Sequence, residues 1–510
     1  MVTRYFGADI YLGNGQWESE IYVSEGIVVS ACKADTEINL SGNTLIPSFR
    51  DGHAHPLFAG REILGLDVTK ARSLEEIGSL LKQYRFNNAS TTWIAGGSYN
   101  RALPGIFSRE FLDSYVSDVP VTIHADDHHT LWANSKALEV AGILGSDLPK
   151  LQQGSIDLDS AGLPNGILRE TEAIQLVLKH QPRPTVQEDS KAFKEAEQRL
   201  ISAGITSVFD AWVEPGIMDS YLALSHELQL DYQLAILISP DNAEESLSVA
   251  KQAIAKFKDN PKVQVQAVKI FIDGVFGSAT AAVEQPYLST GQHGDLNWNK
   301  DSLVETITRA HQLGLQAHIH AIGDKAIEFA IEAIDLAEGG SLPPVIAHAE
   351  LTNSSLLAKV KDKNISLCVQ PYWAQLNDML LSCVQHLGES RTHALYAFKD
   401  MLQLGINVVF SSDWPVSSYK PFEGIAVAVN RRLQNEMPKH NEGQAINLEQ
   451  ALDAYTVNNL KMLGKKASVL NAGDPFDAVL IEGKLKQKNL GELASSKILA
   501  VYKSGVNLLP

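Results

Sequence analysis

The chain has 510 residues, of which 45% are hydrophobic and 20% charged, so it has enough apolar material for a large globular core. Asp and Glu outnumber Lys and Arg by 60 to 43, and the net charge of −17 argues against nucleic acid or an anionic membrane as a partner, because both require a positive surface. The three cysteines form no CxxC pair, and no apolar run is long enough to span a bilayer or to resemble a signal peptide. We therefore expect a cytoplasmic protein, although a secreted chain already stripped of its signal peptide would look the same.

The first fifty residues predict short strands separated by turns, among them Asp9–Leu12 and Ile21–Val23 around the turn residues Gly13-Asn14-Gly15. The last forty residues show the same pattern, with strands expected at Ala478–Ile481 and Ile498–Tyr502. Two β-rich ends around an α/β middle indicate that the termini pair into one small sheet domain.

The middle of the chain alternates strand-like and helix-like runs, which predicts parallel βαβ units. Seven strands are expected at Ser207–Phe209, Gln233–Ile238, Ala267–Ile272, Gln316–His320, Val345–His348, Leu367–Val369 and Val408–Phe410. With one strand that ends near Arg50 they make eight, the number that closes a (β/α)8 barrel. Helices are expected at Ser190–Ala203, Ser302–Leu313, Lys325–Ala337 and Thr392–Leu404. Residues 60–190 remain as a subdomain inserted after the first barrel strand.

The strongest local feature is the segment Asp51-Gly52-His53-Ala54-His55-Pro56. Alternate residues of a strand point to the same face, so His53 and His55 can chelate a single divalent ion. A few close pairs are expected by chance among 15 histidines, and His318-Ile319-His320 and His128-His129 are two others. On its own the pair leaves metal binding and coincidence equally open.

The position of other polar residues favours metal binding. His320, His348 and Asp413 each end a predicted strand, and Lys269 lies inside an otherwise apolar one. Because barrel active sites form at the C-terminal ends of the strands, we expect these four residues and the HxH pair to converge. A lysine in a barrel core is costly unless its charge is removed or paired. Reaction with carbon dioxide would turn it into an anionic metal bridge, and the alternatives are that it snorkels outward or pairs with Asp273.

Longer motifs run along the whole chain: DGHAHPLFAG at 51–60, DDHHTLWANSKAL at 126–138, GILRE at 166–170, VKIFIDGVFGSATAAV at 268–283, HAIGDKA at 320–326, AHAEL at 347–351 and SSDWPV at 411–416. Together they resemble the amidohydrolase superfamily, most closely its third group of YtcJ-like and N-substituted formamide deformylase-like proteins. Two departures, Ser48 where that group often has Gly and Ala279 where it often has Arg, leave the ligand set intact and bear on the substrate.

The resemblance implies an α/β fold in which a (β/α)8 barrel, residues 49–464, stands beside a β-sandwich formed by residues 1–48 and 465–510. It implies that His53, His55 and Asp413 hold one divalent ion, with zinc as the expected metal, and that His320 and His348 hold a second where two are bound. Lys269 would bridge the two ions as a carboxylated lysine. Asp413 would also be catalytic, because it would take a proton from water and deliver it to the leaving amine.

His129, Trp132 and Ser278 are expected to bind substrate, and for His129 and Trp132 the competing interpretation is bonding and packing within the insertion. The implied reaction is hydrolysis of the C–N bond of a small amide, N-formyl amine or cyclic amide. Ester hydrolysis, deamination, isomerisation or decarboxylation on the same barrel are alternatives, as is a regulatory protein that binds metal without turnover. Many members of the family are dimers, so the resemblance also suggests a homodimer.

Overall fold

The computed structural model describes residues 1–126, 128–151 and 154–509, and the chain divides into two compact units. Unit 1 consists of Met1–His55 and Glu197–Pro510, and unit 2 of Pro56–Ala196. The segment predicted as an insertion, residues 60–190, falls within the bounds of unit 2. No helix in the described part of the chain is both long and apolar enough to cross a membrane.

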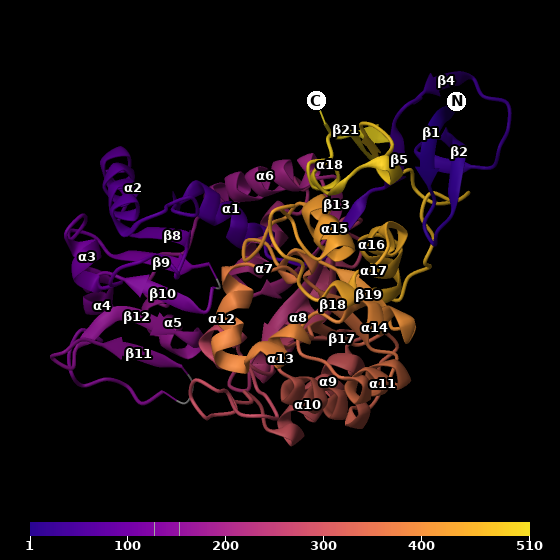
Figure 1. The fold of residues 1–510 in the computed structure, drawn as a ribbon. Helices are drawn as coiled ribbons and strands as arrows, with labels where there is room; N and C mark the ends of the chain where they lie inside the picture. The colour runs from indigo at the N-terminus through magenta and orange to yellow at the C-terminus, as the bar shows by residue number, and fades with distance from the viewer. Residues whose placement is uncertain (127, 152–153, 510) are drawn as a thin grey trace. The chain divides into compact units, whose positions relative to one another are not determined.

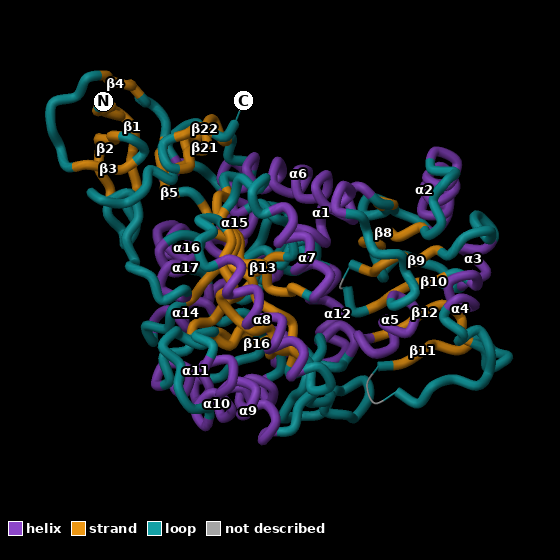
Figure 2. Tube along the Cα trace, turned by 180° about the vertical axis from the view of Figure 1, so that it is seen from behind, coloured by secondary structure: helices purple, strands orange, loops and turns teal. Residues whose placement is uncertain are grey.

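Unit 1 contains a sheet of eight parallel strands whose spatial order follows the chain, with helices around it (Figures 1 and 2). Its strands are β6 (Phe49–Ala54), β13 (Ile205–Val213), β14 (Asp231–Ile238), β15 (Val263–Phe271), β16 (Gln316–Ala321), β17 (Val345–His348), β18 (Ser366–Val369) and β19 (Val408–Phe410). Every predicted barrel strand has its counterpart here. The first one runs further than expected, past Arg50 to Ala54, so that His53 lies inside the strand.

The sheet closes on itself where the chain leaves β19. Asp413 donates its backbone N–H to the carbonyl of His53 at 2.7 Å, and His55 donates to the carbonyl of Trp414 at 2.7 Å. Gly52 allows this approach, because a Cβ atom at that position would lie 2.6 Å from Cγ1 of Val409 and 3.1 Å from Sγ of Cys368. The nearly closed barrel therefore joins its first and last strands next to the HxH pair.

Helices between the strands bury one face each against the sheet. On α9 (Lys300–Gln312), for example, Leu303, Ile307 and Ala310 recur every three or four residues and are buried. The other helices of this unit are α7 (Pro215–Leu224), α8 (Ala243–Phe257), α10 (Asp324–Leu336), α11 (Ser354–Asp362), α12 (Asp378–Leu387), α13 (Glu389–His393), α14 (Phe398–Gln403), α15 (Pro421–Asn430), α16 (Leu448–Ala454), α17 (Val457–Met462) and α18 (Leu490–Ala494).

The prediction of one helix over Thr392–Leu404 was wrong, because two helices, α13 and α14, occupy that stretch. Between them Tyr396 takes a left-handed backbone conformation, with φ of 62°, and donates its N–H to the carbonyl of Glu350. That non-local hydrogen bond replaces a helical one and interrupts the apolar period seen in the sequence.

The two termini form one sheet, as expected. It comprises β1 (Val2–Tyr11), β2 (Trp17–Ser24), β3 (Ile27–Val29), β4 (Thr36–Asn39), β5 (Thr44–Pro47), β20 (Ala478–Ile481), β21 (Ile498–Lys503) and β22 (Val506–Asn507). β20 pairs antiparallel with β5, which joins the C-terminal strands to the N-terminal ones. This sheet has a hydrophobic core of its own that includes Tyr5, Ile10 and Phe476. The second layer expected of a sandwich stays a prediction.

Unit 2 contains a six-stranded mixed sheet in the order β11-β12-β10-β9-β8-β7. Its strands are β7 (Leu66–Asp67), β8 (Ile94–Tyr99), β9 (Val121–Ala125), β10 (Thr130–Ala133), β11 (Ser155–Leu158) and β12 (Pro164–Arg169). Its helices are α1 (Pro56–Leu64), α2 (Leu74–Asn87), α3 (Arg109–Asp113), α4 (Ser135–Val140), α5 (Glu170–Leu178) and most of α6 (Val186–Ser202). The unit buries its own core around Ile77, Ile94 and Trp132.

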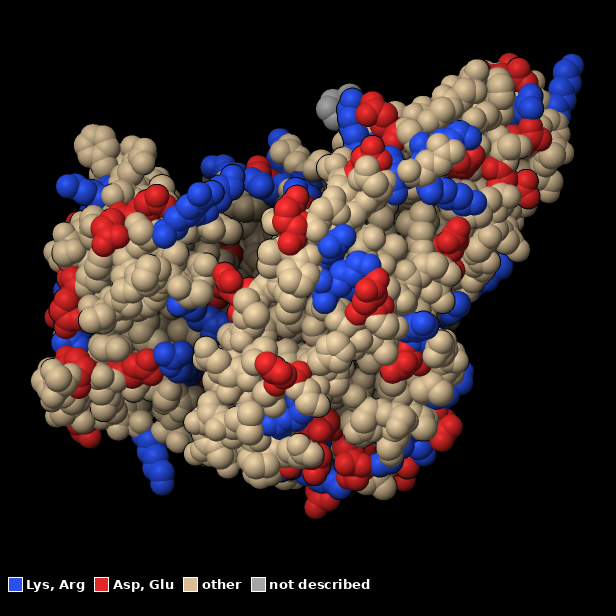
Figure 3. Space-filling view, viewed as in Figure 1, with Lys and Arg blue, Asp and Glu red and all other residues tan. Residues whose placement is uncertain are grey.

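Acidic and basic side chains are interspersed over the face drawn in Figure 3. The excess of 17 negative charges is therefore not gathered into a single acidic patch on that face. On this face the mixture is typical of a solvated protein surface.

Candidate metal centre

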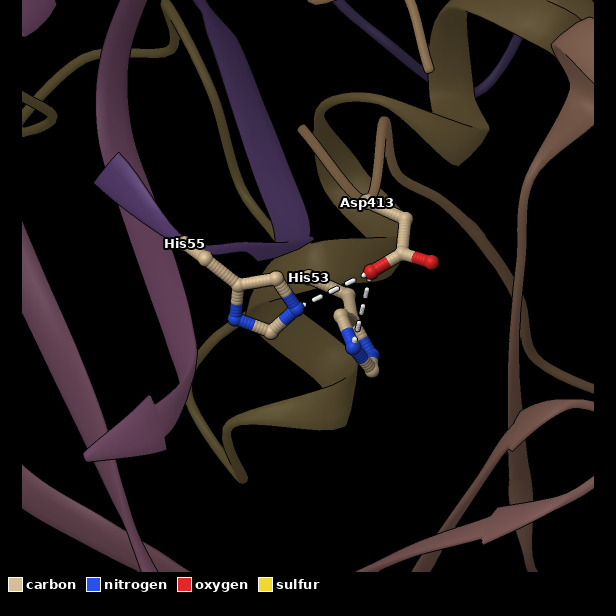
Figure 4. A group of neighbouring side chains, drawn as sticks. All are labelled: His53, His55 and Asp413. Atoms are coloured by element: carbon tan, nitrogen blue, oxygen red, sulfur yellow. Dashed lines mark hydrogen bonds and ion pairs between the residues drawn. The ribbon is translucent and has the colours of Figure 1, made fainter. Parts of the chain in front are cut away.

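Three predicted ligands meet at the seam where the barrel closes. Asp413 Oδ1 lies 3.0 Å from Nε2 of His55 and 3.4 Å from Nε2 of His53 (Figure 4). The histidines come from the end of β6, and Asp413 follows β19, so two segments far apart in sequence supply the group. Its three ligand atoms all lie within 4.8 Å of one another, and it is the one such three-residue group found among the described residues.

The donor set fits a divalent metal ion such as zinc. Imidazole nitrogen and carboxylate oxygen are both zinc ligands, with bonds of about 2.0–2.2 Å that place neighbouring ligand atoms roughly 3.3 Å apart in a tetrahedral site. The separations of 3.0 and 3.4 Å agree with that spacing. The identity of the metal does not follow from three donors, because imidazole and carboxylate also suit other divalent ions.

Electrostatics act differently on the three side chains. Burial and the nearby charge of Lys269 lower the pKa of His53 well below its ordinary value, so its ring is neutral near pH 7. Burial alone would raise the pKa of Asp413, but its hydrogen bond to His55 and the nearby charges lower that pKa below the ordinary value. For His55, burial is outweighed by the nearby carboxylates of Asp210 and Asp413, and its pKa is raised. A neutral imidazole and an ionised carboxylate are the forms that coordinate metal, so His53 and Asp413 favour binding, whereas at His55 an ion competes with a proton.

Lys269 lies with the same group, inside β15. Its Nζ is 3.4 Å from Nε2 of His53 and 4.5 Å from the centre of the Phe271 ring, and the side chain is 1% exposed. Burial lowers the pKa of this amine to about 7, although the charge of Asp413 opposes the change. The ion pair with Asp273 that the sequence left open is not among the contacts of Lys269 in the described structure. The carboxylate of Asp273 instead accepts backbone N–H groups of Ala282, Ile322 and Gly323.

His320 and His348, the predicted ligands of a second ion, lie beside each other at the ends of β16 and β17. Their ring centres are 4.4 Å apart, and the ring of His348 is 5.0 Å from that of His53. In this structure Nε2 of His320 donates to the carbonyl of Gly274 at 3.2 Å, and Nδ1 of His348 donates to Oε1 of Gln370 at 2.9 Å. The two rings therefore adjoin the first group without forming a three-ligand cluster of their own.

The backbone around the candidate ligands is strained. His348, Ala349 and Asp413 have φ values of 71°, 44° and 57°, in a left-handed region that residues other than glycine seldom adopt. Each such residue costs roughly 1–3 kcal/mol and persists where its surroundings hold it, as at active sites. Asp51 is one such hold, because its carboxylate accepts from Ser412 N at 2.9 Å and from Ser412 Oγ, next to Asp413.

Sequence reasoning missed residues that support the ligands. Asp210 on β13 lies 3.9 Å from Nδ1 of His55 and accepts a hydrogen bond from Tyr221, and Gln370 holds His348 from the end of β18. Both are polar residues in or just after apolar strand segments, the same signal that identified His348 and Asp413. Such partners fix the orientation of metal-binding histidines.

The three predicted substrate-binding residues have different surroundings. Ser278 is half-buried after β15, and its hydroxyl has no partner among the described residues. In unit 2, Nδ1 of His129 is 2.8 Å from Oε2 of Glu170, while Asp127 of the same motif lies outside the described residues. Trp132 is 0% exposed within the core of unit 2 and donates its indole N–H to the carbonyl of Ser108. The burial of Trp132 favours the packing interpretation over substrate contact.

Comparison with known proteins agrees with the resemblance of the motifs. The chain is 25% identical to YtcJ of Bacillus subtilis, which carries the name amidohydrolase, over 94% of this chain and 93% of that protein. It is 24% identical to the N-substituted formamide deformylase of Arthrobacter pascens, over 95% of this chain and 92% of the deformylase. A metal-dependent hydrolase of Pyrococcus horikoshii has the same fold, with a TM-score of 0.76 at 23% identity over 96% of this chain and 98% of that one. The sequence pattern of the amidohydrolase family matches residues 36–508, and the chain therefore belongs to that family.

Proposed function

We propose that this chain is a metal-dependent hydrolase that cleaves the C–N bond of a small amide, an N-formyl amine or a cyclic amide, other than a peptide bond. The observation that carries the proposal is the buried group of His53, His55 and Asp413 at the C-terminal ends of the barrel strands. Relatives named amidohydrolase and N-substituted formamide deformylase support the choice of bond.

In this proposal His53, His55 and Asp413 hold one divalent ion, and His320 and His348 contribute to a second. The ions are expected to be zinc. A bound divalent ion supplies Lewis acidity, which polarises a carbonyl group and makes water a stronger acid.

Lys269 would join the two sets as a carbamate. Its amine, with a pKa of about 7, is largely neutral just above neutral pH, and the neutral form is the one that attacks carbon dioxide. The nitrogen forms a bond to the carbon, one C–O π bond gives its electron pair to oxygen, and the nitrogen releases one proton, so that the neutral amine becomes an anionic carbamate. This removes the cost of a buried positive charge and adds two oxygen donors next to His53.

Asp413 would move the proton of the reaction. Its lowered pKa keeps it ionised near pH 7, so it can accept a proton from the attacking water and return it to the leaving nitrogen. Oδ1 lies 3.0 Å from Nε2 of His55, a separation that suits two ligands of one ion and fixes the position of the carboxylate. Ser278 and His129 are proposed to contact the substrate, Ser278 because its buried hydroxyl is available to a ligand.

The test combines metal content with a substrate panel. Protein purified without chelator is analysed for metals, and its turnover is measured on N-formyl amines, N-acyl amines and cyclic amides. Esters, amino-substituted rings and dipeptides serve as the contrast set. The matched control is His53→Asn, which should lower both the metal content and every genuine activity.

We expect one or two equivalents of a divalent ion and hydrolysis of at least one amide class that is lost on chelation and regained on adding metal. Turnover confined to esters or to ring amines would replace the proposed bond but keep the metal centre. Metal without turnover on any compound would favour a regulatory protein. Absence of metal would overturn the proposal.

A further inference from the structure

A hydrogen bond crosses the interior of the barrel beneath the candidate metal centre. Nε2 of His318, on β16, lies 2.9 Å from Nδ1 of His53, on β6. The two strands are four apart in the order of the eight barrel strands, so the bond joins strands that face each other across the barrel. It uses the nitrogen of His53 that faces away from Asp413, since Asp413 and Lys269 lie next to Nε2.

Among the described residues, the ring of His318 makes no other hydrogen bond. It is 0% exposed, and its Nδ1 has no hydrogen-bond partner among the described residues. One face stacks on Phe209, with ring centres 4.6 Å apart and an angle of 22° between the planes. Buried polar groups normally have a hydrogen-bond partner. Here the single hydrogen bond goes to a candidate ligand.

That bond decides which nitrogen of His53 is free. The contact can form with the proton on either ring, but only a proton on Nδ1 of His53 leaves its Nε2 with a bare lone pair. A metal ion requires that lone pair, and a histidine ligand usually donates its other N–H to a fixed acceptor. Nε2 of His318 is placed to be that acceptor.

The backbone pairing fixes the height of His318 in the barrel. It pairs directly with Lys269 across β15 and β16, while His320 pairs with Phe271. The two histidines of the His318-Ile319-His320 segment therefore occupy successive levels, with His320 nearer the strand end. His318 meets the back of the His53 ring, and His320 adjoins the ring of His348.

We infer that His318 is a positioning residue for the metal centre: it holds His53 in the tautomer whose Nε2 binds the ion, and it does not bind the ion itself. The inference rests on the proposed function, because it concerns the metal held by His53. Asp210 and Gln370 stand behind His55 and His348 in a similar way, but each of those is a carboxylate or an amide, whereas His53 relies on a neutral ring.

The test compares His318→Met with His318→Gln. Both side chains are unbranched and of similar length, but only glutamine offers an oxygen that can accept the N–H of His53. His318→Phe, which keeps the stack on Phe209 without a nitrogen, is the second variant if the methionine variant does not fold. His440→Met is the matched control, since His440 is a buried histidine beside Arg431 and His393. Zinc affinity of each folded protein is measured by competition with a chelator at a single pH, and zinc content is measured at saturation.

We expect the dissociation constant for zinc to rise about 10- to 100-fold in His318→Met and His318→Phe. His318→Gln should recover most of that loss, His440→Met should match the parent protein, and zinc content at saturation should stay the same in all of them. Unchanged affinity in His318→Met would overturn the inference and leave His318 a packing residue. Loss of a full equivalent of zinc would also overturn it, because His318 would then be a ligand. No zinc on the parent protein would instead overturn the proposed function.

Discussion

Replacing Lys269 by methionine should make the metal-free protein more stable near neutral pH and remove a pH dependence. Methionine has nearly the same length and no charge, while Lys269 is 1% exposed, with its pKa lowered from 10.5 to about 7. Between those pH values the unfolded chain holds a proton that the folded protein has released. The free energy of unfolding of the parent protein therefore rises with pH over this range. This gain in stability is lost again as the pH falls towards 7.

The size of the effect follows from the same two values. A difference of 3.5 pH units between 10.5 and about 7 corresponds to about 5 kcal/mol, at about 1.4 kcal/mol for each unit. Lys269→Met avoids this cost at every pH. We expect the variant to exceed the parent protein by several kcal/mol near pH 7, and the gap to shrink to about 1 kcal/mol near pH 10.

The assay is urea unfolding of metal-free protein in buffers without carbon dioxide, at several pH values between 6.5 and 10. Comparing parent and variant at each pH cancels the other titrating groups. Lys251→Met, at an exposed position on α8, should leave the pH dependence of the parent unchanged. A gap between Lys269→Met and the parent that stays constant with pH would refute the reasoning, and with it the neutral amine that carbamate formation needs.

Substitutions at three further positions test other parts of the structure. Asp413→Asn should lower turnover at least about 100-fold and reduce bound metal, because the side chain loses both its charge and its role as a base; unchanged turnover would remove Asp413 from the chemistry. Gly52→Ala should destabilise the protein by about 1–3 kcal/mol in urea unfolding, because its Cβ would lie 2.6 Å from Val409, and a neutral result would contradict the close approach at the seam. Trp132→Ala should cost unit 2 about 3–5 kcal/mol of stability. Trp132→Phe should keep KM unchanged, and a raised KM in this variant would restore Trp132 as a substrate contact.

Most barrel strands could be predicted because they contain an apolar run that a polar residue ends, as His348 ends the run Val345–Ala347. The same rule located His320, His348 and Asp413, since a ligand at a strand end interrupts the apolar pattern. The same rule applies to Gln370, which follows β18, but its amide supports the ligand His348 and is not itself a candidate ligand.

Other features depend on contacts that no local pattern contains. The break before α14 arises from a hydrogen bond between Tyr396 and Glu350, which lie far apart in the sequence. The left-handed backbone of His348 and Asp413 is held by neighbouring strands, and neither residue type predicts that conformation. The contact of His318 with His53 requires the order of the barrel strands, because only that order places β16 opposite β6.

The site and the closure of the barrel are physically one feature. His53 and His55 lie on one side of the seam and Asp413 on the other, and the backbone bonds of these same residues join the two sides. An ion held by all three would cross-link the first and last strands of the barrel and would bind only when the seam is closed. At a free concentration one hundred times its dissociation constant, such an ion stabilises the closed barrel by about 2.7 kcal/mol. Substitution of a ligand therefore weakens the seam and the chemistry together, and activity alone cannot separate them. The two effects can be separated by measuring metal affinity together with the stability of the metal-free protein, because only the affinity depends on the lone pairs that face the ion.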